Sequence, residues 1–115
     1  MVCGTSGSGK STLTTAILEG LDDAGYQSVI VDPEGDYTNL EFATVLGNPD
    51  QAPRPEDVTD ALRDVRRSVV VNLLGIPLAD RPKFFAQLLP RVLEMKARTG
   101  RPHWLVVDEA HHLLP

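Results

Sequence analysis

The stretch that decides the fold of this chain is Gly4-Thr-Ser-Gly-Ser-Gly-Lys-Ser11. It matches the pattern G-x-x-x-x-G-K-[ST], in which glycines let the backbone turn so that consecutive N–H groups point inward toward phosphate. A short apolar segment precedes it, and helical spacing of apolar residues over 11–24 predicts a helix after it. The N-terminus of that helix would add to the anion-binding site. The pattern therefore predicts a phosphate-binding loop between a strand and a helix.

Each position of this loop has an expected role toward a bound nucleoside triphosphate and its magnesium ion. Lys10 would reach the β- and γ-phosphate oxygens as a compact charge and so take part in catalysis. The Ser11 hydroxyl would take one place in the Mg2+ shell, and Thr12 would donate to the α-phosphate. The predicted nucleotide-binding residues are Gly4, Thr5, Ser6, Gly7, Ser8, Gly9, Lys10, Ser11 and Thr12.

An acidic pair ends the last apolar segment of the chain, Trp104-Leu-Val-Val-Asp-Glu109. A parallel strand delivers its terminal side chains to the carboxyl edge of the sheet, where the phosphate loop also lies. We therefore predict that Asp108 holds Mg2+ through water and that Glu109 is the catalytic base that polarises the attacking water. In the structural alternative, Asp108 caps a following helix and Glu109 is a solvated acid in its first turn.

A second group of acids, Asp32, Glu34 and Asp36, follows the apolar segment Ser28–Val31 and so belongs to the same edge of the sheet. As secondary site residues they would contact Mg2+ indirectly, act as a base toward an acceptor hydroxyl, or contact the nucleotide of a neighbouring subunit. Acidic residues are also common in tight turns without any ligand. The sequence leaves these interpretations open.

Strand-like and helix-like segments alternate along the chain, which predicts an α/β fold with a parallel sheet flanked by helices. The expected helices are 11–24, with Leu13, Ile17 and Leu21 on one apolar stripe, 56–67, and a last helix from Asp80 to Gly100 that Pro90 should kink or split. The expected strands are residues 28–31, 69–74 and 104–108, whereas the segment 33–55 is rich in turn residues.

The positions of the two motifs relative to the chain ends predict a partial domain. Only three residues precede Gly4, fewer than the ~5–6 of a typical strand, and the chain stops soon after its acidic pair. We expect residues 1–115 to form one nucleotide-binding domain of a P-loop NTPase, truncated at both ends.

The composition limits the classes of partner. The net charge of −5 lacks the basic footprint of a domain that binds nucleic acid by itself. No apolar run approaches the ~18–20 residues that span a bilayer, so no membrane partner is expected. The start of the chain lacks the features of a secretory signal and the single cysteine forms no internal disulfide, which favours the cytoplasm.

Four segments together resemble the HerA-like ATPases, in the HerA and FtsK branch of the P-loop proteins. They are GTSGSGKST at 4–12, VDPEGDY at 31–37, GIP at 75–77 and LVVDEAHHLLP at 105–115. The resemblance implies adjacent Walker A and Walker B strands, ATP hydrolysis with Mg2+, Glu109 as the base, and a homo-hexameric ring that pumps DNA. In that family, the sensor residue and the arginine finger belong partly to segments that are not present here.

Other classes share parts of this pattern. Small-molecule kinases such as adenylylsulfate kinase have a similar phosphate loop, and Asp32 and Asp36 would then handle an acceptor hydroxyl. The later acidic pair suits activation of water better than transfer to an acceptor. The segment Asp-Glu-Ala-His at 108–111 is also similar to superfamily-two helicases, whose full motor is absent. A third class is a module that binds nucleotide and changes conformation without turnover.

Overall fold

The computed structural model describes residues 2–4 and 8–108, with side chains described from Thr12 to Val107. A single 3-10 turn, Leu78–Asp80, precedes the last helix. The other elements, in chain order, are β1 (Val2–Gly4), α1 (Ser8–Asp23), β2 (Ser28–Asp32), β3 (Ala43–Leu46), α2 (Pro55–Leu62), β4 (Ser68–Asn72), α3 (Arg81–Thr99) and β5 (Trp104–Asp108).

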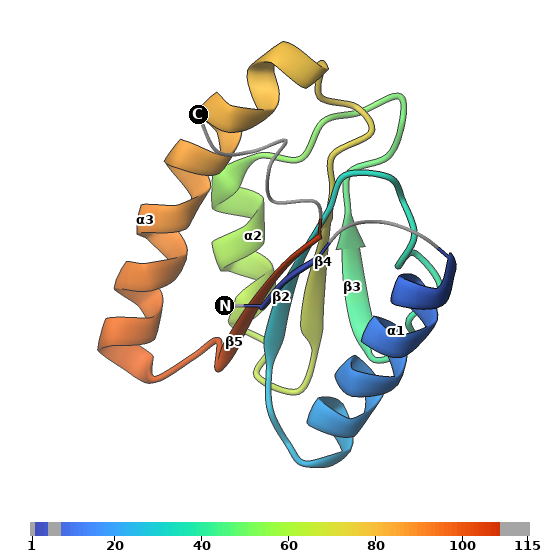
Figure 1. Ribbon diagram of the computed structural model, residues 1–115. Helices are drawn as coiled ribbons and strands as arrows, with labels where there is room; N and C mark the ends of the chain where they lie inside the picture. Colours follow the sequence, from blue (N-terminus) through green and yellow to red (C-terminus); the bar gives the residue numbers. More distant parts are fainter. Residues whose placement is uncertain (1, 5–7, 109–115) are drawn as a thin grey trace.

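The strands form one parallel sheet in the order β1-β5-β2-β4-β3. Helix α1 covers one face of the sheet, and α2 and α3 cover the other (Figure 1). The β-branched runs of β2 and β4 are buried on both faces, as expected for inner strands of a parallel sheet. The predicted α/β fold is confirmed, and β1 pairs directly with β5, as the resemblance to HerA-like ATPases implied.

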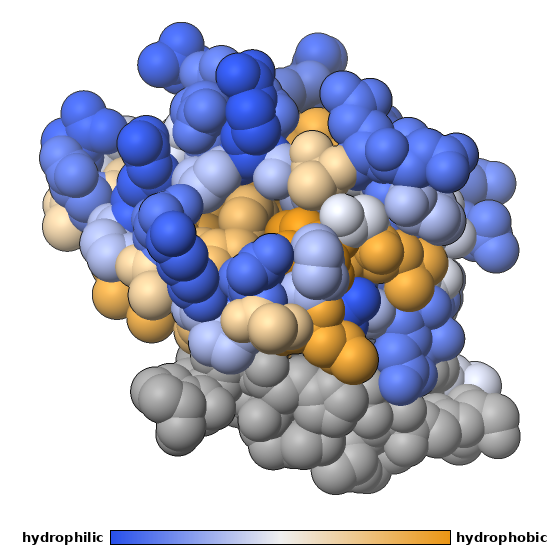
Figure 2. All heavy atoms as spheres, turned by 90° about the horizontal axis from the view of Figure 1, so that it is seen from above, coloured by the Kyte–Doolittle hydropathy of each residue, from blue (hydrophilic) through white to orange (hydrophobic). Residues whose placement is uncertain are grey.

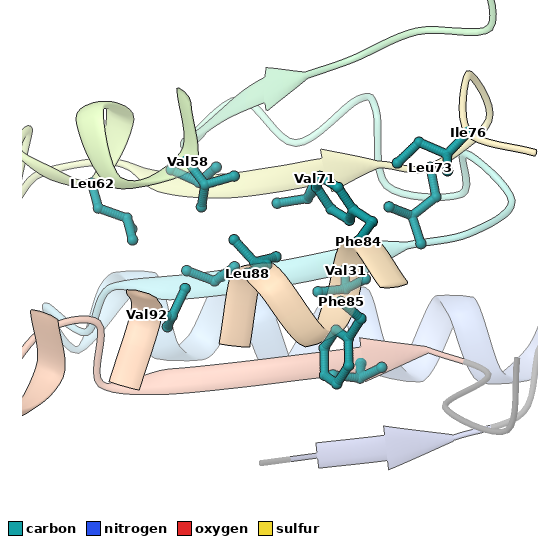
Figure 3. Close-up of a cluster of buried hydrophobic side chains, with 13 residues drawn as sticks. Val31, Val58, Leu62, Val71, Leu73, Ile76, Phe84, Phe85, Leu88 and Val92 are labelled. Atoms are coloured by element: carbon teal, nitrogen blue, oxygen red, sulfur yellow. The ribbon is translucent and has the colours of Figure 1, made fainter. Parts of the chain in front are cut away.

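The larger part of the core lies between the sheet and the α2/α3 layer (Figure 3). Successive residues of a strand point to opposite faces, so Val29 and Val31 of β2 enter this cluster while Ile30 packs on the α1 side. Leu88 of α3 belongs to this cluster and is fully buried. Within residues 12–107, this layer therefore carries most of the apolar burial that stabilises the fold.

Helix α1 turns its predicted apolar stripe away from the sheet. Leu13 is 62% exposed and Ile17 49% exposed, whereas Leu18 is 1% exposed and enters the core. The predicted helix is present, but its stripe is not the buried face, since Leu21, its third member, is only partly buried. Periodicity identifies which residues share a face of a helix, but the approach of the helix to the sheet decides which face is buried.

Four other predictions differ from the structure. The strand predicted at 69–74 is β4 (Ser68–Asn72), which ends two residues earlier. The turn-rich segment 33–55 contains the short edge strand β3, whose neighbouring Gly and Pro residues hid it. Helix α2 ends at Leu62, not at residue 67, because residues 63–67 form turns. Helix α3 is not split at Pro90, which lies on its exposed face, where water can bond to the carbonyl that loses its partner.

The predicted ends of the last helix agree with the structure. Asp80 occupies the N-cap position of α3, although its side chain makes no capping hydrogen bond, and Gly100 ends the helix in the left-handed conformation with φ 77°. Among the described helices, none combines the length and the apolar character that a bilayer crossing requires.

Candidate nucleotide-binding site

The strand ends place the predicted site residues in one row at the carboxyl edge of the sheet. Gly4, the last residue of β1, pairs with Asp108, the last residue of β5. Asp32 lies on the neighbouring strand β2, one residue beyond the pair Val31 and Val107. The sheet therefore places the start of the phosphate loop, the predicted Mg2+ ligand and the second acidic group on three adjacent strands.

The chain between β1 and α1 is short, so the first turn of α1 begins at this same edge. The helix starts at Ser8, four positions after Gly4, and contains Gly9, Lys10 and Ser11 in its first turn. A helix N-terminus at the carboxyl edge of a parallel sheet attracts anions through its unpaired N–H groups. This backbone arrangement is the one that the phosphate-loop pattern requires.

Part of the predicted site lies outside the described residues. Thr5, Ser6, Gly7 and Glu109 are in this group, and for Gly4, Ser8–Ser11 and Asp108 the structure describes the backbone. Their roles toward phosphate, Mg2+ and water remain predictions.

Asp32 is bound to its own loop. Its side chain is fully buried, and its carboxylate accepts hydrogen bonds from the backbone N–H groups of Asp36 and Tyr37, both at 3.0 Å. Burial raises the pKa of Asp32 above its ordinary value, while these N–H groups act in the opposite direction. The geometry supports the tight-turn interpretation for Asp32, because both carboxylate oxygens serve the turn.

Asn72 is the counterpart of Asp32 on the neighbouring strand, and the sequence analysis missed it. It ends β4 directly opposite Asp32, is 3% exposed, and accepts a 2.8 Å hydrogen bond from the N–H of Leu74. The sequence contained a signal for Asn72. It is the polar residue that interrupts the apolar run 69–74, just as Asp32 is the polar residue that ends the apolar run of β2. Both side chains thus fix the loops that leave the sheet at this edge.

The loops that follow β2, β3 and β4 interlock at this edge. A Cβ atom on Gly47, whose φ is +87°, would lie 2.7 Å from the carbonyl oxygen of Asn72. A Cβ atom on Gly35 would lie 2.9 Å from Leu74 Cδ1. Figure 2 looks down on this end of the molecule, where hydrophobic side chains lie near the centre and hydrophilic ones lie above and on both sides of them in the view. The close packing makes the edge beside the phosphate loop a fixed platform.

Glu34 and Asp36 have a different environment from Asp32, because both are exposed. Asp36 and Thr12 line the same open hollow of about 420 Å³ beside α1, together with Thr15, Ala16 and Glu19. Of the secondary acids, Asp36 is therefore the one that shares a cavity with a predicted nucleotide-binding residue.

The two predicted Mg2+ ligands are a hydroxyl and a carboxylate oxygen. Among the described residues, no group of three or more His, Cys, Asp or Glu side chains could hold a metal ion. Mg2+ keeps several waters and takes one or two protein ligands plus phosphate oxygens from a nucleotide. The Ser11 hydroxyl and the Asp108 carboxylate are oxygen donors of the kind that Mg2+ prefers, so the residues fit an ion that arrives with the nucleotide.

A parallel sheet with a phosphate-loop sequence between its first strand and first helix defines the class of P-loop NTPases. A family model described as an AAA domain matches residues 1–115, and the chain therefore belongs to this family of nucleotide-binding domains. The comparison with curated proteins and the comparison with solved structures found no match.

Proposed function

We propose that the chain binds ATP with Mg2+ and hydrolyses it as the core of a HerA-like motor ATPase. The observation that supports this proposal most is the row of strand ends, in which Gly4 pairs with Asp108 beside the first turn of α1. A phosphate group bound by the loop would then lie next to Asp108, at the end of β5. The AAA family match supports nucleotide binding independently of the row.

Each residue of the site has one task in the proposed reaction. Lys10 and the backbone N–H groups of residues 4–12 bind the phosphates, and the charge on Lys10 stabilises the charge that develops on the γ-phosphoryl group. Ser11 and Asp108 orient Mg2+, which neutralises phosphate charge when bound. Glu109 accepts a proton from the water that attacks the γ-phosphorus.

Binding is tested by titrating a fluorescent ATP analogue in the presence of Mg2+. Lys10→Ala should abolish binding because the contact to the β- and γ-phosphate oxygens is lost, and Asp108→Asn should weaken only the Mg2+-dependent part. Lys83→Ala, at an exposed position of α3, is the matched control and should bind as the wild type does. Equal affinity of Lys10→Ala and wild type would refute the proposed site.

Turnover is tested with Glu109→Gln, which keeps shape and hydrogen bonding but cannot accept a proton. It should retain ATP binding and lose hydrolysis, whereas Glu94→Gln on the exposed face of α3 should change neither. Hydrolysis by separate copies should be slow, since an arginine from a neighbour is worth ~10³–10⁵ in rate where measured in GTPases. Binding without any turnover, even in assembled copies, would favour a nucleotide-binding module.

The motor part of the proposal predicts a response to DNA. A homo-hexameric ring that moves along DNA should hydrolyse ATP faster when duplex DNA is added, and this stimulation should fall steeply as salt rises. ATP hydrolysis that ignores DNA at all salt concentrations would keep the ATPase and reject the DNA motor.

A small-molecule kinase is the second candidate, and the exposed position of Asp36 in the hollow beside Thr12 favours it. Asp32 is less suited to bind an acceptor hydroxyl, since its carboxylate already accepts two backbone hydrogen bonds. The variant Asp36→Asn separates the two candidates. Loss of phosphate transfer to a hydroxyl acceptor in Asp36→Asn, together with full hydrolysis in Glu109→Gln, would replace the ATPase with a kinase.

A further inference from the structure

A hollow of about 280 Å³ lies between α3 and β5. Its lining comes from three elements, which are α3, the turn that follows α3, and the first part of β5. This turn lies at the end of the sheet opposite to the candidate nucleotide site, because β5 begins there and ends at Asp108 (Figure 1). The hollow is therefore separate from the candidate nucleotide site.

The wall of this hollow is mostly apolar. Leu89, Val92 and Leu93 follow helical spacing along α3, and Leu105 of β5 adds a fourth aliphatic side chain. Val92 is buried, Leu89 and Leu105 are half-buried, and Leu93 is 51% exposed. A ligand with an apolar body would remove these side chains from water, which is favourable in proportion to the apolar area that it covers.

The turn at one end of the hollow holds a positive charge. Lys96 Nζ donates to the carbonyl oxygens of His103 at 2.8 Å and Pro102 at 3.4 Å, and all three residues line the hollow. An ammonium group has three N–H donors, so these contacts leave one for a ligand. Among the described residues, no carboxylate forms an ion pair with Lys96 and none lines the hollow. Glu94 is near in sequence, but it lines a different hollow between α2 and α3.

His103 adds a neutral donor beside this charge. Its Nδ1 accepts the N–H of Gln27 at 3.0 Å, so Nε2 carries the proton of the neutral ring. Burial lowers the pKa of His103, and the nearby positive charges of Arg101 and Lys96 act in the same direction. The two cations and the ring donor therefore lie close together, and this end of the hollow favours an anionic group over a cationic one.

We propose that this hollow binds a small amphipathic carboxylate, with its aliphatic body against Leu93 and Leu105 and its carboxylate on Lys96. The ammonium group gives the carboxylate a charge-assisted hydrogen bond, and the aliphatic wall covers the rest of the ligand. Sites for drug-sized ligands have volumes of ~300–1,000 Å³, and this hollow, at about 280 Å³, is slightly smaller. Its size therefore suits a molecule of about ten non-hydrogen atoms.

A small carboxylate suits this hollow better than a nucleic acid. A phosphate backbone binds to a row of cations, whereas Lys96 is the only lysine or arginine among the described side chains that line the hollow. The leucine and valine side chains of its wall also offer no ring on which a base would stack. The chemistry of the lining thus matches one negative charge joined to an aliphatic body.

The test is an NMR titration of the whole chain with octanoate, kept below its micelle-forming concentration. The amide signals of residues that line the hollow, Leu93 and Leu105 among them, should shift until the site is saturated, with a Kd of about 0.1–1 mM. Octanol has the aliphatic body without the charge, and acetate has the charge without the body. Each of these two should bind at least about tenfold more weakly than octanoate, because each loses one half of the contact.

Two variants separate the charged end from the apolar wall. Lys96→Gln removes the charge but keeps a side chain that donates hydrogen bonds, so it should weaken octanoate binding at least about fivefold and leave octanol binding unchanged. Leu93→Gln should weaken the binding of both ligands, because both use the apolar wall. Lys83→Gln, at an exposed position of α3 outside the hollow, is the matched control and should bind octanoate as the wild type does. Circular dichroism checks folding, and the comparison of the three ligands on the wild type needs no variant.

Three results would overturn the proposal. One is a wild-type chain in which octanoate causes no saturable shift at the hollow. Another is octanol or acetate that binds as tightly as octanoate, which would assign the hollow to apolar molecules in general or to anions in general. The third is a folded Lys96→Gln protein that binds octanoate as tightly as the wild type.

Discussion

The two faces of the sheet are built differently. Among the side chains that the structure describes, residues 12–107, the α2/α3 side buries a cluster of thirteen apolar residues and the α1 side a cluster of six. Buried polar groups also fasten the α2/α3 side, such as Arg81 Nε, which donates to the carbonyl oxygen of Ile76 at 3.0 Å. The comparison indicates that one side supplies most of the stability, while the other holds the helix whose first turn belongs to the nucleotide site.

The largest effect should separate the two faces directly. Leu88→Ala removes a fully buried side chain of α3 and should lower the free energy of unfolding by about 3 kcal/mol, through lost burial and a residual cavity. Leu13→Ala is the matched change on α1 and should alter it by less than about 0.5 kcal/mol, since Leu13 is 62% exposed. Urea unfolding measures both, and equal losses would contradict the asymmetry.

A second change should loosen the connection between α2 and β4. Gln27 is 1% exposed, and its Nε2 donates to the carbonyl oxygens of Leu62, Asp64 and Arg67 at 3.0, 3.2 and 3.0 Å. Gln27→Leu leaves these carbonyls without that donor and should cost about 1–2 kcal/mol in urea unfolding.

The matched control for Gln27 is Gln87→Leu on the exposed face of α3, expected to change the free energy of unfolding by less than about 0.5 kcal/mol. Among the described atoms Gln27 Oε1 has no hydrogen-bond partner, so its removal offsets part of the loss. A Gln27→Leu protein as stable as the control would show that water replaces the lost donor.

The sequence predicted two of the inner strands, β2 and β5, well because their apolar runs are continuous and bounded by turn residues. Ser28–Asp32 and Trp104–Asp108 begin and end within a residue of the prediction. It could not predict the direction of α1, since Leu13 and Leu18 are equally apolar and only the packed helix shows that Leu18 faces Ile30 and Val70. The sequence also predicted too long a helix α2, because the helical spacing of apolar residues continues to Val65. In the structure, the side chain of Gln27, which is distant in sequence, donates hydrogen bonds to the carbonyl oxygens of Asp64 and Arg67 and holds the residues after Leu62 in turns.

The candidate site was predictable where a local pattern carries the chemistry. The phosphate loop and the acidic pair follow strands in the sequence, and strand pairing brings Gly4 and Asp108 side by side. The environment of Asp32 was not predictable, because its burial and its hydrogen bonds to Asp36 and Tyr37 arise from the folded loop. Acid spacing alone does not distinguish a turn from a ligand site.

The smallest expected effect concerns His103, at the junction between α3, β5 and the start of β2. Its Nδ1 accepts a 3.0 Å hydrogen bond from the N–H of Gln27, and Lys96 Nζ donates to its carbonyl oxygen at 2.8 Å. Desolvation lowers the pKa of His103 below its ordinary value of 6.5, and the nearby positive charges of Arg101 and Lys96 add to this effect. Protonation of Nδ1 would also remove the acceptor that Gln27 uses.

The sign of the pH dependence follows from these contacts. The pKa of His103 is lower in the folded chain than in the unfolded chain. As pH falls below about 6.5, the unfolded chain therefore binds more protons than the folded chain, and the free energy of unfolding decreases. His103→Asn keeps an acceptor but does not titrate, so it should flatten the fall in unfolding free energy between about pH 7 and pH 5 relative to wild type. The difference should be smaller than the effect of Gln27→Leu, because His103 is only partly buried. Urea unfolding at closely spaced pH values measures both slopes. Identical slopes of unfolding free energy against pH in the two proteins would show that His103 has the same pKa in the folded and unfolded chain. The contacts of His103 at the α3 side of the sheet would then add no pH dependence to stability.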